Sequence, residues 1–176
     1  MLTRCLATLL LSVLAPLAFA ASPKAGETPP DALGVDREGN AVHVGDFRGR
    51  PLVVTFWASW CHYCLKEMPV LEALQQKAGG RLQVVAINFR EDKREYRALL
   101  RKLGKVALLM THDTGPVSEA YGVDTLPNLF LIDAEGKVAF TLNGYDEKSL
   151  PGLVDRINGL MRDAEIASAG MAQRSP

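Results

Sequence analysis

From residue 51 to residue 64 the chain reads Pro51-Leu-Val-Val-Thr-Phe-Trp-Ala-Ser-Trp-Cys-His-Tyr-Cys64. Its apolar, β-branched and aromatic part, Leu52–Trp57, predicts a buried strand. The two cysteines come shortly after this strand, and the sequence that follows them has the apolar spacing of a helix. The expected local structure is therefore a strand that leads into a helix with two thiols on its first turn.

This position suits the two thiols to redox chemistry. A helix N-terminus has unpaired backbone N–H groups and a partial positive charge, which stabilise the first sulfur as a thiolate. Cys61 is therefore the expected nucleophile. Cys64, one turn further in, is close enough to form a disulfide with Cys61 and is expected to be more buried, so it would resolve a mixed disulfide.

Other interpretations of the cysteine pair are weaker. A structural disulfide stabilises mainly by closing a long loop, and this one spans only two intervening residues. A zinc site needs four ligands, and no second cysteine pair accompanies the scattered His43, His62 and His112. Copper(I) binding stays open as a minor alternative. No cofactor or resident metal is expected, and His43 and His112 are expected to be surface residues.

Both ends of the chain are predicted to lie outside the folded domain. Residues 1–20 have the pattern of a secretory signal peptide, with Arg4, the apolar run Leu6–Phe19 and an A-x-A site for cleavage after Ala20. Residues 21–30 are interpreted as a flexible linker, 31–163 as one domain and 164–176 as a disordered tail. In the alternative, an uncleaved N-terminal segment anchors the protein in the inner membrane.

Export would place the thiols in the periplasm, an oxidising compartment where disulfides persist. The chain has 20 Lys and Arg and 20 Asp and Glu, and the predicted signal removes only Arg4 from this balance, which leaves a formal charge near −1. Such a balance gives no indication of binding to nucleic acid or to an anionic membrane. A monomer is expected.

The rest of the sequence predicts alternating helices and strands. Helices are predicted at 61–78, 92–103, 116–121 and 150–161, and strands at 82–89, 106–110, 128–132 and 137–142. This order predicts a three-layer α/β fold with a mixed sheet. The helix at 92–103 has basic residues that we interpret as a solvated face rather than a docking surface: Lys93, Arg94, Arg97, Arg101 and Lys102.

Three separated motifs resemble the thioredoxin fold in their order and spacing. They are Phe56-Trp-Ala-Ser-Trp-Cys-His-Tyr-Cys64, Leu65-Lys-Glu-Met-Pro69 and Tyr121-Gly-Val-Asp-Thr-Leu-Pro-Asn-Leu-Phe-Leu-Ile-Asp133. Within this fold the chain resembles the TlpA/ResA/DsbE group of exported thiol–disulfide oxidoreductases, over about residues 31–160. The resemblance implies a thioredoxin-like three-layer fold, with a central mixed β-sheet flanked by helices.

The resemblance also implies roles for individual residues. Cys61 matches the attacking cysteine of the group, and Cys64 matches the resolving one. Pro127 matches a cis-proline that lies opposite the disulfide, where the backbone of the preceding residue, Leu126, would pair with an extended substrate segment. Residues beside the cysteines would contact the substrate as well: Trp60, His62 and Tyr63.

Glu67 matches the glutamate that the group has three residues after the second cysteine. Helical spacing independently places it on or beside the inward face, since it lies three residues after Cys64 and next to Met68. Burial would raise its pKa and suit it to accept the proton of a buried thiol. The alternative is a solvent-facing glutamate. Thr55 stands where cytoplasmic thioredoxins have a buried aspartate.

The chain departs from the group at several positions near the cysteines. Tyr63 replaces the usual proline, and Asn128 replaces the commoner threonine after the cis-proline. A protonated His62 would stabilise the Cys61 thiolate and shift the couple toward oxidising character. In the alternative, a solvated His62 would have little effect on the redox potential of the cysteine pair. Because these residues lie close to the cysteines, the departures leave open the redox potential of the pair and therefore the direction of electron flow.

The resemblance implies an enzyme that reduces disulfides of other exported proteins, with apocytochrome c and copper-site proteins as possible substrates. A membrane-embedded electron donor would re-reduce it. The alternatives are a disulfide-forming oxidase or isomerase, which His62 would favour, and a copper-handling chaperone of similar fold. A thiol peroxidase is excluded, since its motif needs Thr and Pro where this chain has Ala58 and Val54.

Overall fold

Strand β3 (Leu52–Trp57) lies inside the sheet, and all of its residues are buried. It runs parallel to β4 (Gln83–Phe89) and antiparallel to β6 (Asn128–Ile132). Because both faces of the strand are covered, its sequence is apolar almost throughout instead of alternating with polar residues. The strand predicted at this position is confirmed.

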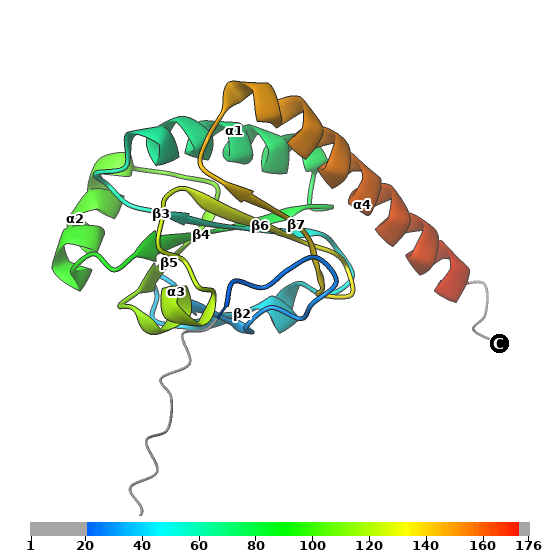
Figure 1. Ribbon diagram of the computed structural model, residues 1–176, viewed down its shortest axis with the longest axis horizontal. Coiled ribbons are helices and arrows are strands. Elements are labelled where there is room, and N and C mark those ends of the chain that lie inside the picture. Colours follow the sequence, from blue (N-terminus) through cyan, green and yellow to red (C-terminus); the bar gives the residue numbers. More distant parts are fainter. Residues whose placement is uncertain (1–20, 173–176) are drawn as a thin grey trace, which may run out of the picture.

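The computed structural model describes residues 21–172, so the predicted signal peptide at 1–20 and residues 173–176 lie outside the described part. A mixed sheet of seven strands forms the middle layer, in the order β2-β1-β5-β4-β3-β6-β7 (Figure 1). Its other strands are β1 (Ala32–Val35), β2 (Ala41–His43), β5 (Leu109–Asp113) and β7 (Val138–Asn143). The predicted three-layer α/β class with a mixed sheet is confirmed.

Helices cover both faces of the sheet, and α1 and α4 lie on the opposite side from α3 (Figure 1). The first face packs against α1 (His62–Ala78), α2 (Lys93–Leu103) and α4 (Leu150–Ala172). The second packs against η1 (Val44–Phe47) and α3 (Pro116–Ala120), and a short turn, η2 (Glu147–Ser149), precedes α4. Alternate residues of the central strands β3, β4 and β6 supply the two cores, as the pleat of a strand requires.

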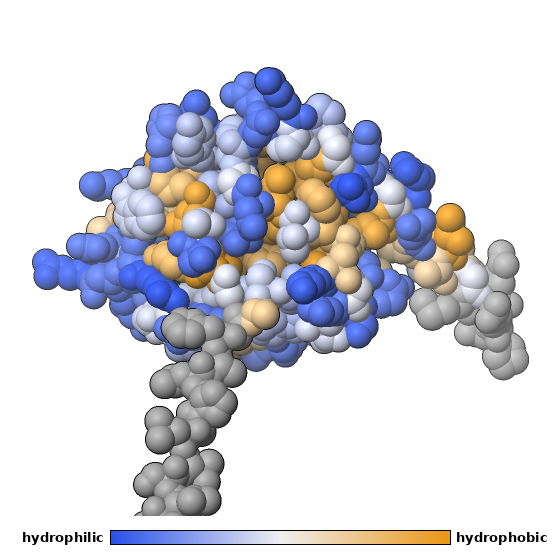
Figure 2. Space-filling model, viewed as in Figure 1, coloured by the Kyte–Doolittle hydropathy of each residue, from blue (hydrophilic) through white to orange (hydrophobic). Residues whose placement is uncertain are grey.

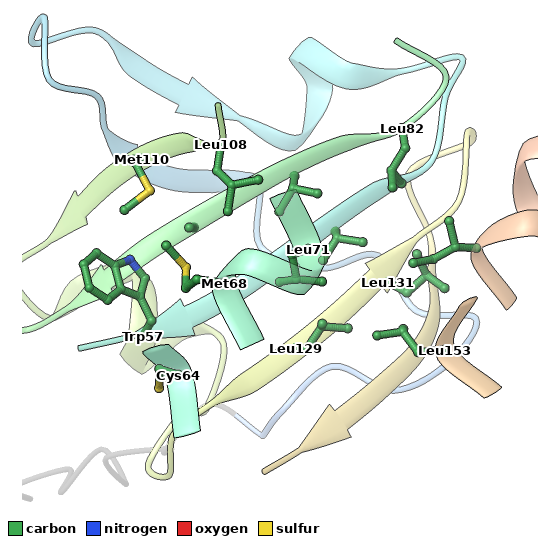
Figure 3. Packing of buried hydrophobic residues seen from close by; sticks show 14 of the residues in the cluster. Trp57, Cys64, Met68, Leu71, Leu82, Leu108, Met110, Leu129, Leu131 and Leu153 are labelled. Carbon is green, nitrogen blue, oxygen red and sulfur yellow. The ribbon is translucent and has the colours of Figure 1, made fainter. Parts of the chain in front are cut away.

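The first core contains the redox pair. Cys61 and Cys64 belong to the same apolar cluster as Trp57 and Met68. Figure 3 shows Trp57 and Cys64 at one end of this cluster, with Met68 and Leu71 further along. The thiols are therefore built on a rigid support, at the carboxyl end of β3.

The strand predicted at 106–110 begins later than expected, as β5 (Leu109–Asp113). The backbone of Ala107 is held by side chains of α1 instead: its N–H donates to Glu72 Oε1 at 2.6 Å, and its carbonyl accepts from Gln75 Nε2 at 2.9 Å. These contacts direct the chain toward α1 before it joins the sheet beside β4.

Residues 21–30 differ from the predicted flexible linker. The N–H of Gly26 donates to the carbonyl of Val138 at 2.8 Å, and the N–H of Val138 donates to the carbonyl of Glu27 at 3.0 Å. Pro23 and Pro29 are buried. The segment therefore pairs with Val138 at the start of β7, the strand at one edge of the sheet.

The C-terminal helix is longer than predicted. It was expected to end near Met161, with a disordered tail from 164, but α4 runs to Ala172 and its last turns extend beyond the sheet (Figure 1). The added turns are rich in alanine, the strongest helix former. An ion pair of 3.0 Å between Arg81 and Glu165 also ties them to the domain.

Candidate active site

Cys61 is the N-cap residue of α1, so the helix starts one residue later than predicted. Its backbone is extended, and the N–H of Cys64 donates to Cys61 Sγ at 3.2 Å. In the reduced protein, the same N–H and the partial positive charge of the helix end would face a Cys61 thiolate. The local structure thus favours ionisation of the first cysteine.

The two cysteines form a disulfide, and they differ in exposure. Cys61 retains 7% of its surface, whereas Cys64 retains none. Cys61 is therefore the sulfur that an incoming protein can reach. Cys64 lies against the apolar core, where an ionised thiolate would be poorly solvated.

Large side chains stand exposed around Cys61. Trp60 is 68% exposed, Tyr63 is 56% exposed and Leu65 is 43% exposed. His62 is also exposed and lies against Tyr63, with 5.9 Å between ring centroids. Exposed apolar surface of this kind marks sites of contact with other molecules. The predicted substrate-contacting residues Trp60, His62 and Tyr63 are thus all accessible.

The peptide bond between Leu126 and Pro127 is cis, as the resemblance implied. Asn128 pairs with Phe56 in the antiparallel register, so Leu126 and Pro127 lie at the end of β3 from which the chain continues to Cys61. Leu126 packs against the apolar cluster that contains both cysteines. The structure therefore brings this segment to the redox end of the sheet.

Glu67 is buried, with 2% of its surface exposed, so the inward orientation is confirmed and the solvent-facing alternative is wrong. The hydroxyl of Thr55 on β3 donates to Glu67 Oε2 at 2.7 Å. Desolvation raises the pKa of Glu67 from 4.5 to about 7, against the opposing effect of the Thr55 hydrogen bond. A carboxyl group with this pKa can exchange a proton near neutral pH.

Glu91, which no sequence pattern singled out, holds the loop in front of Cys61 in place. Its carboxylate accepts the N–H of Ser59 at 3.0 Å and short hydrogen bonds from the Ser59 hydroxyl and from Asn88 Nδ2. The N–H of Cys61 donates to the carbonyl of Ala58 at 3.1 Å, so Ser59 lies inside the turn that leads to Cys61. No local pattern pointed to this contact, because 32 residues separate its partners.

The histidines depart from their predicted surface positions at one place. His112 is buried, with 8% of its surface exposed, and its Nε2 lies 2.7 Å from the carbonyl oxygen of Glu91. Its ring stacks on Tyr96 at 4.9 Å. His43 is only partly exposed and lies beside Asp31, with 3.2 Å between Nδ1 and Oδ2. His112 is thus a core residue behind the Glu91 loop.

Within 21–172, no group of three or more His, Cys, Asp or Glu side chains is placed to hold a metal ion. In the same part of the chain, no helix is long and apolar enough to cross a membrane.

Comparison with known proteins agrees with this geometry. The Redoxin family model matches residues 24–157. The thiol-disulfide oxidoreductase ResA of Geobacillus thermodenitrificans (strain NG80-2) is 34% identical over 122 residues, which cover 68% of this chain and 69% of that protein.

Solved structures agree as well. A Chlorobium tepidum protein assigned as thiol:disulfide interchange protein DsbE superposes with a TM-score of 0.72 at 29% identity, covering 80% of this chain and 99% of that one. The exposed lipoprotein thioredoxin Etrx1 of Streptococcus pneumoniae strain TIGR4 has a TM-score of 0.61 at 26% identity, covering 69% of this chain and 96% of that one. The chain therefore belongs to the Redoxin family, in which it is a TlpA/ResA/DsbE-like thiol–disulfide oxidoreductase with a thioredoxin-like fold.

Proposed function

We propose that the protein acts as a reductase of disulfides in exported proteins. The observation that supports this most directly is the asymmetry of the pair, with an accessible Cys61 at the helix end and a buried Cys64. The second support is Glu67, which is buried on the inward face of the same helix and whose pKa of about 7 would let it accept a proton there. The buried Cys64 thiol needs such an acceptor, because it must lose its proton before it can attack the mixed disulfide at Cys61.

The proposed reaction has two exchange steps. The Cys61 thiolate attacks one sulfur of the substrate disulfide, and the other substrate sulfur leaves as a thiolate that takes a proton from water. Cys64 then loses its proton toward Glu67 and attacks Cys61 Sγ. This releases the second substrate thiol and leaves the Cys61–Cys64 disulfide. Two electrons pass to the substrate, and a dithiol donor must return them.

Substrate binding is proposed beside Leu126 and Pro127, and against Trp60, His62 and Tyr63. An extended segment could pair with the backbone of Leu126, which is partly exposed, while the exposed rings supply apolar contact. The segment would approach Cys61 from the surface. Pairing through the backbone tolerates many sequences, which suits an enzyme that meets several protein substrates.

The compartment and partners are also proposals. The signal-like pattern at 1–20 and the likeness to an exposed lipoprotein thioredoxin support export to the periplasm, with or without cleavage after Ala20. The likeness to ResA and DsbE supports substrates such as apocytochrome c or copper-site proteins, and a membrane-embedded donor for re-reduction.

A redox titration of the Cys61–Cys64 pair against glutathione tests the direction. We expect a potential nearer that of thioredoxin, about −270 mV, than that of the strongest oxidase of this fold, about −120 mV. A value near the oxidase end, together with efficient oxidation of a reduced unfolded protein, would overturn the reductase proposal in favour of a disulfide-forming oxidase.

A further inference from the structure

The exposed side of α2 is strongly basic. We define the α2 cationic face as the exposed basic side chains of this helix: Lys93, Arg94, Arg97, Arg101 and Lys102. The opposite side of the helix supplies Tyr96 and Leu100 to the core. In the space-filling view, the end of the molecule where α2 lies is mostly hydrophilic (Figure 2). The chain as a whole has no such excess of positive charge.

The charges of this face are only partly compensated, because the acidic side chains on or beside it are fewer than the basic ones: Asp36, Asp92 and Glu95. None of its side chains forms an ion pair with another described residue. Lys93, Arg97 and Arg101 follow one another at four-residue spacing, where like charges destabilise a helix. The nearby acidic side chain of Asp92 is used as the N-cap, accepting the N–H groups of Arg94 and Glu95. The helix therefore keeps mutually repelling basic side chains that do not contribute to the packing of the core.

The face is also hollowed, unlike a plain solvated helix. Three adjoining depressions share Arg97 as a lining residue, and two of them also share Arg37 from the turn after β1. The most enclosed of them is lined by the apolar side chains of Val35, Tyr96 and Leu100, together with the charged side chains of Asp36 and Lys93. Arginines around small apolar hollows suit a peptide with carboxylate side chains, because each guanidinium can bind a carboxylate through two hydrogen bonds.

The position of the face links it to the redox site. Helix α2 begins two residues after Glu91, whose carboxylate holds Ser59 in the loop before Cys61. A partner lying along α2 can therefore extend toward the disulfide without crossing the molecule. A partner bound there would be positioned for exchange with Cys61.

We propose that the α2 cationic face docks an acidic segment of the protein whose disulfide exchanges with the Cys61–Cys64 pair. This inference rests on the proposed function, since it concerns the partner of the same site. Charge complementarity would act mainly on the rate of encounter, and screening by salt would weaken it. On this proposal the face would be a docking surface instead of the merely solvated face expected from the sequence.

Reduction kinetics of synthetic peptides test the inference. Two peptides carry the same disulfide loop, one followed by a run of glutamates and the other by a run of lysines, and hydroxyethyl disulfide serves as an uncharged substrate. We expect the reduced protein to act about tenfold faster on the acidic peptide at low salt, with the difference lost at high salt. Arg97→Glu should abolish the preference and leave the rate with hydroxyethyl disulfide unchanged.

The control is Arg162→Glu, an equal change of charge at an exposed position of α4, which should keep the preference. Arg97→Glu should fold, since it replaces two repulsive i,i+4 pairs with attractive ones. Equal rates for both peptides would overturn the docking inference, whereas failure to reduce any of the three substrates would overturn the proposed function. Binding of anionic phosphatidylglycerol vesicles that Arg97→Glu abolishes, without a peptide preference, would assign the face to lipid and also overturn the inference.

Discussion

The hydroxyl of Thr55 donates a hydrogen bond of 2.7 Å to the carboxylate of Glu67 inside the protein core. It joins the central strand β3 to the helix that begins at the redox pair. Thr55 is fully buried and Glu67 is nearly so. One hydrogen bond does not offset the loss of hydration, so the pKa of Glu67 is about 7 instead of 4.5. This relationship leads to the first two predictions.

Glu67→Gln should change how stability depends on pH. The folded protein keeps Glu67 protonated up to about pH 7, whereas the unfolded chain releases this proton near 4.5. Between these values the folded state binds more protons, so the free energy of unfolding falls as pH rises, by up to about 3 kcal/mol. The neutral variant should lose this decline. Urea unfolding of the oxidised proteins should show equal stability near pH 4 and a more stable variant near pH 8. A variant less stable than the parent at alkaline pH would contradict a raised pKa of the buried Glu67.

The same substitution should slow the resolving step. Without a carboxylate on the inward face, the Cys64 thiol loses its proton acceptor, and the loss of rate should be largest near neutral pH. Single-turnover reduction of a peptide disulfide, followed against pH, measures this. Glu135→Gln, an exposed glutamate in the turn between β6 and β7, is the matched control. An unchanged pH–rate profile in Glu67→Gln would remove Glu67 from the mechanism.

The positions of the two cysteines at the start of α1 predict that their thiols have different pKa values. The pKa of Cys61 should lie well below the free value of about 8.5, because the N–H of Cys64 and the helix end face its sulfur. Alkylation rates of the reduced protein against pH should titrate at this lowered value, and Cys64→Ala should accumulate mixed disulfides with substrate. If Cys64 proves the more acidic and reactive thiol, the two assigned roles are reversed.

Glu91→Ala should destabilise the loop in front of the nucleophile. The substitution removes the acceptor for the N–H and hydroxyl of Ser59 and for the amide of Asn88. Leaving partly buried donors without an acceptor should lower the free energy of unfolding by about 1–3 kcal/mol. Urea unfolding measures the loss, and Glu91→Gln, which keeps an acceptor oxygen, should recover part of it. Equal losses in both variants would contradict a role through hydrogen bonding to Ser59.

His62→Ala should move the redox potential only slightly. The side chain is exposed, so any effect of its charge on the Cys61 thiolate is screened by water. We expect a shift toward more reducing values of no more than about 30 mV, which corresponds to about 1.4 kcal/mol for a two-electron couple. Titration of both proteins against glutathione gives the difference. A shift of about 150 mV, the difference between thioredoxin and the strongest oxidase of this fold, would instead make His62 the residue that sets the direction of electron flow.

Local patterns in the sequence were sufficient for the elements that carry the chemistry. A run of apolar residues identified β3. Three-residue spacing identified Met68 and Leu71 on the inward side of α1, although Leu65, which shares this spacing, is 43% exposed. The helix end supports the assignment of Cys61 as the nucleophile. Glu67 was found in the same way, since its relation to Cys64 is set by one turn of helix. These features were predictable because each depends on residues that are neighbours in the chain.

Tertiary structure alone decided the features that depend on distant partners. Packing brought Glu91 to Ser59, buried His112 behind it, laid residues 26–27 along β7 and drew Ala107 toward α1. It also placed the turn after β1 beside α2, which turned a row of basic residues into a hollowed surface next to the redox loop. Periodicity reports which side of an element is buried, but not which distant residue covers it. The sequence by itself therefore determined the redox pair and its helix, while the fold determined what holds that pair and what can approach it.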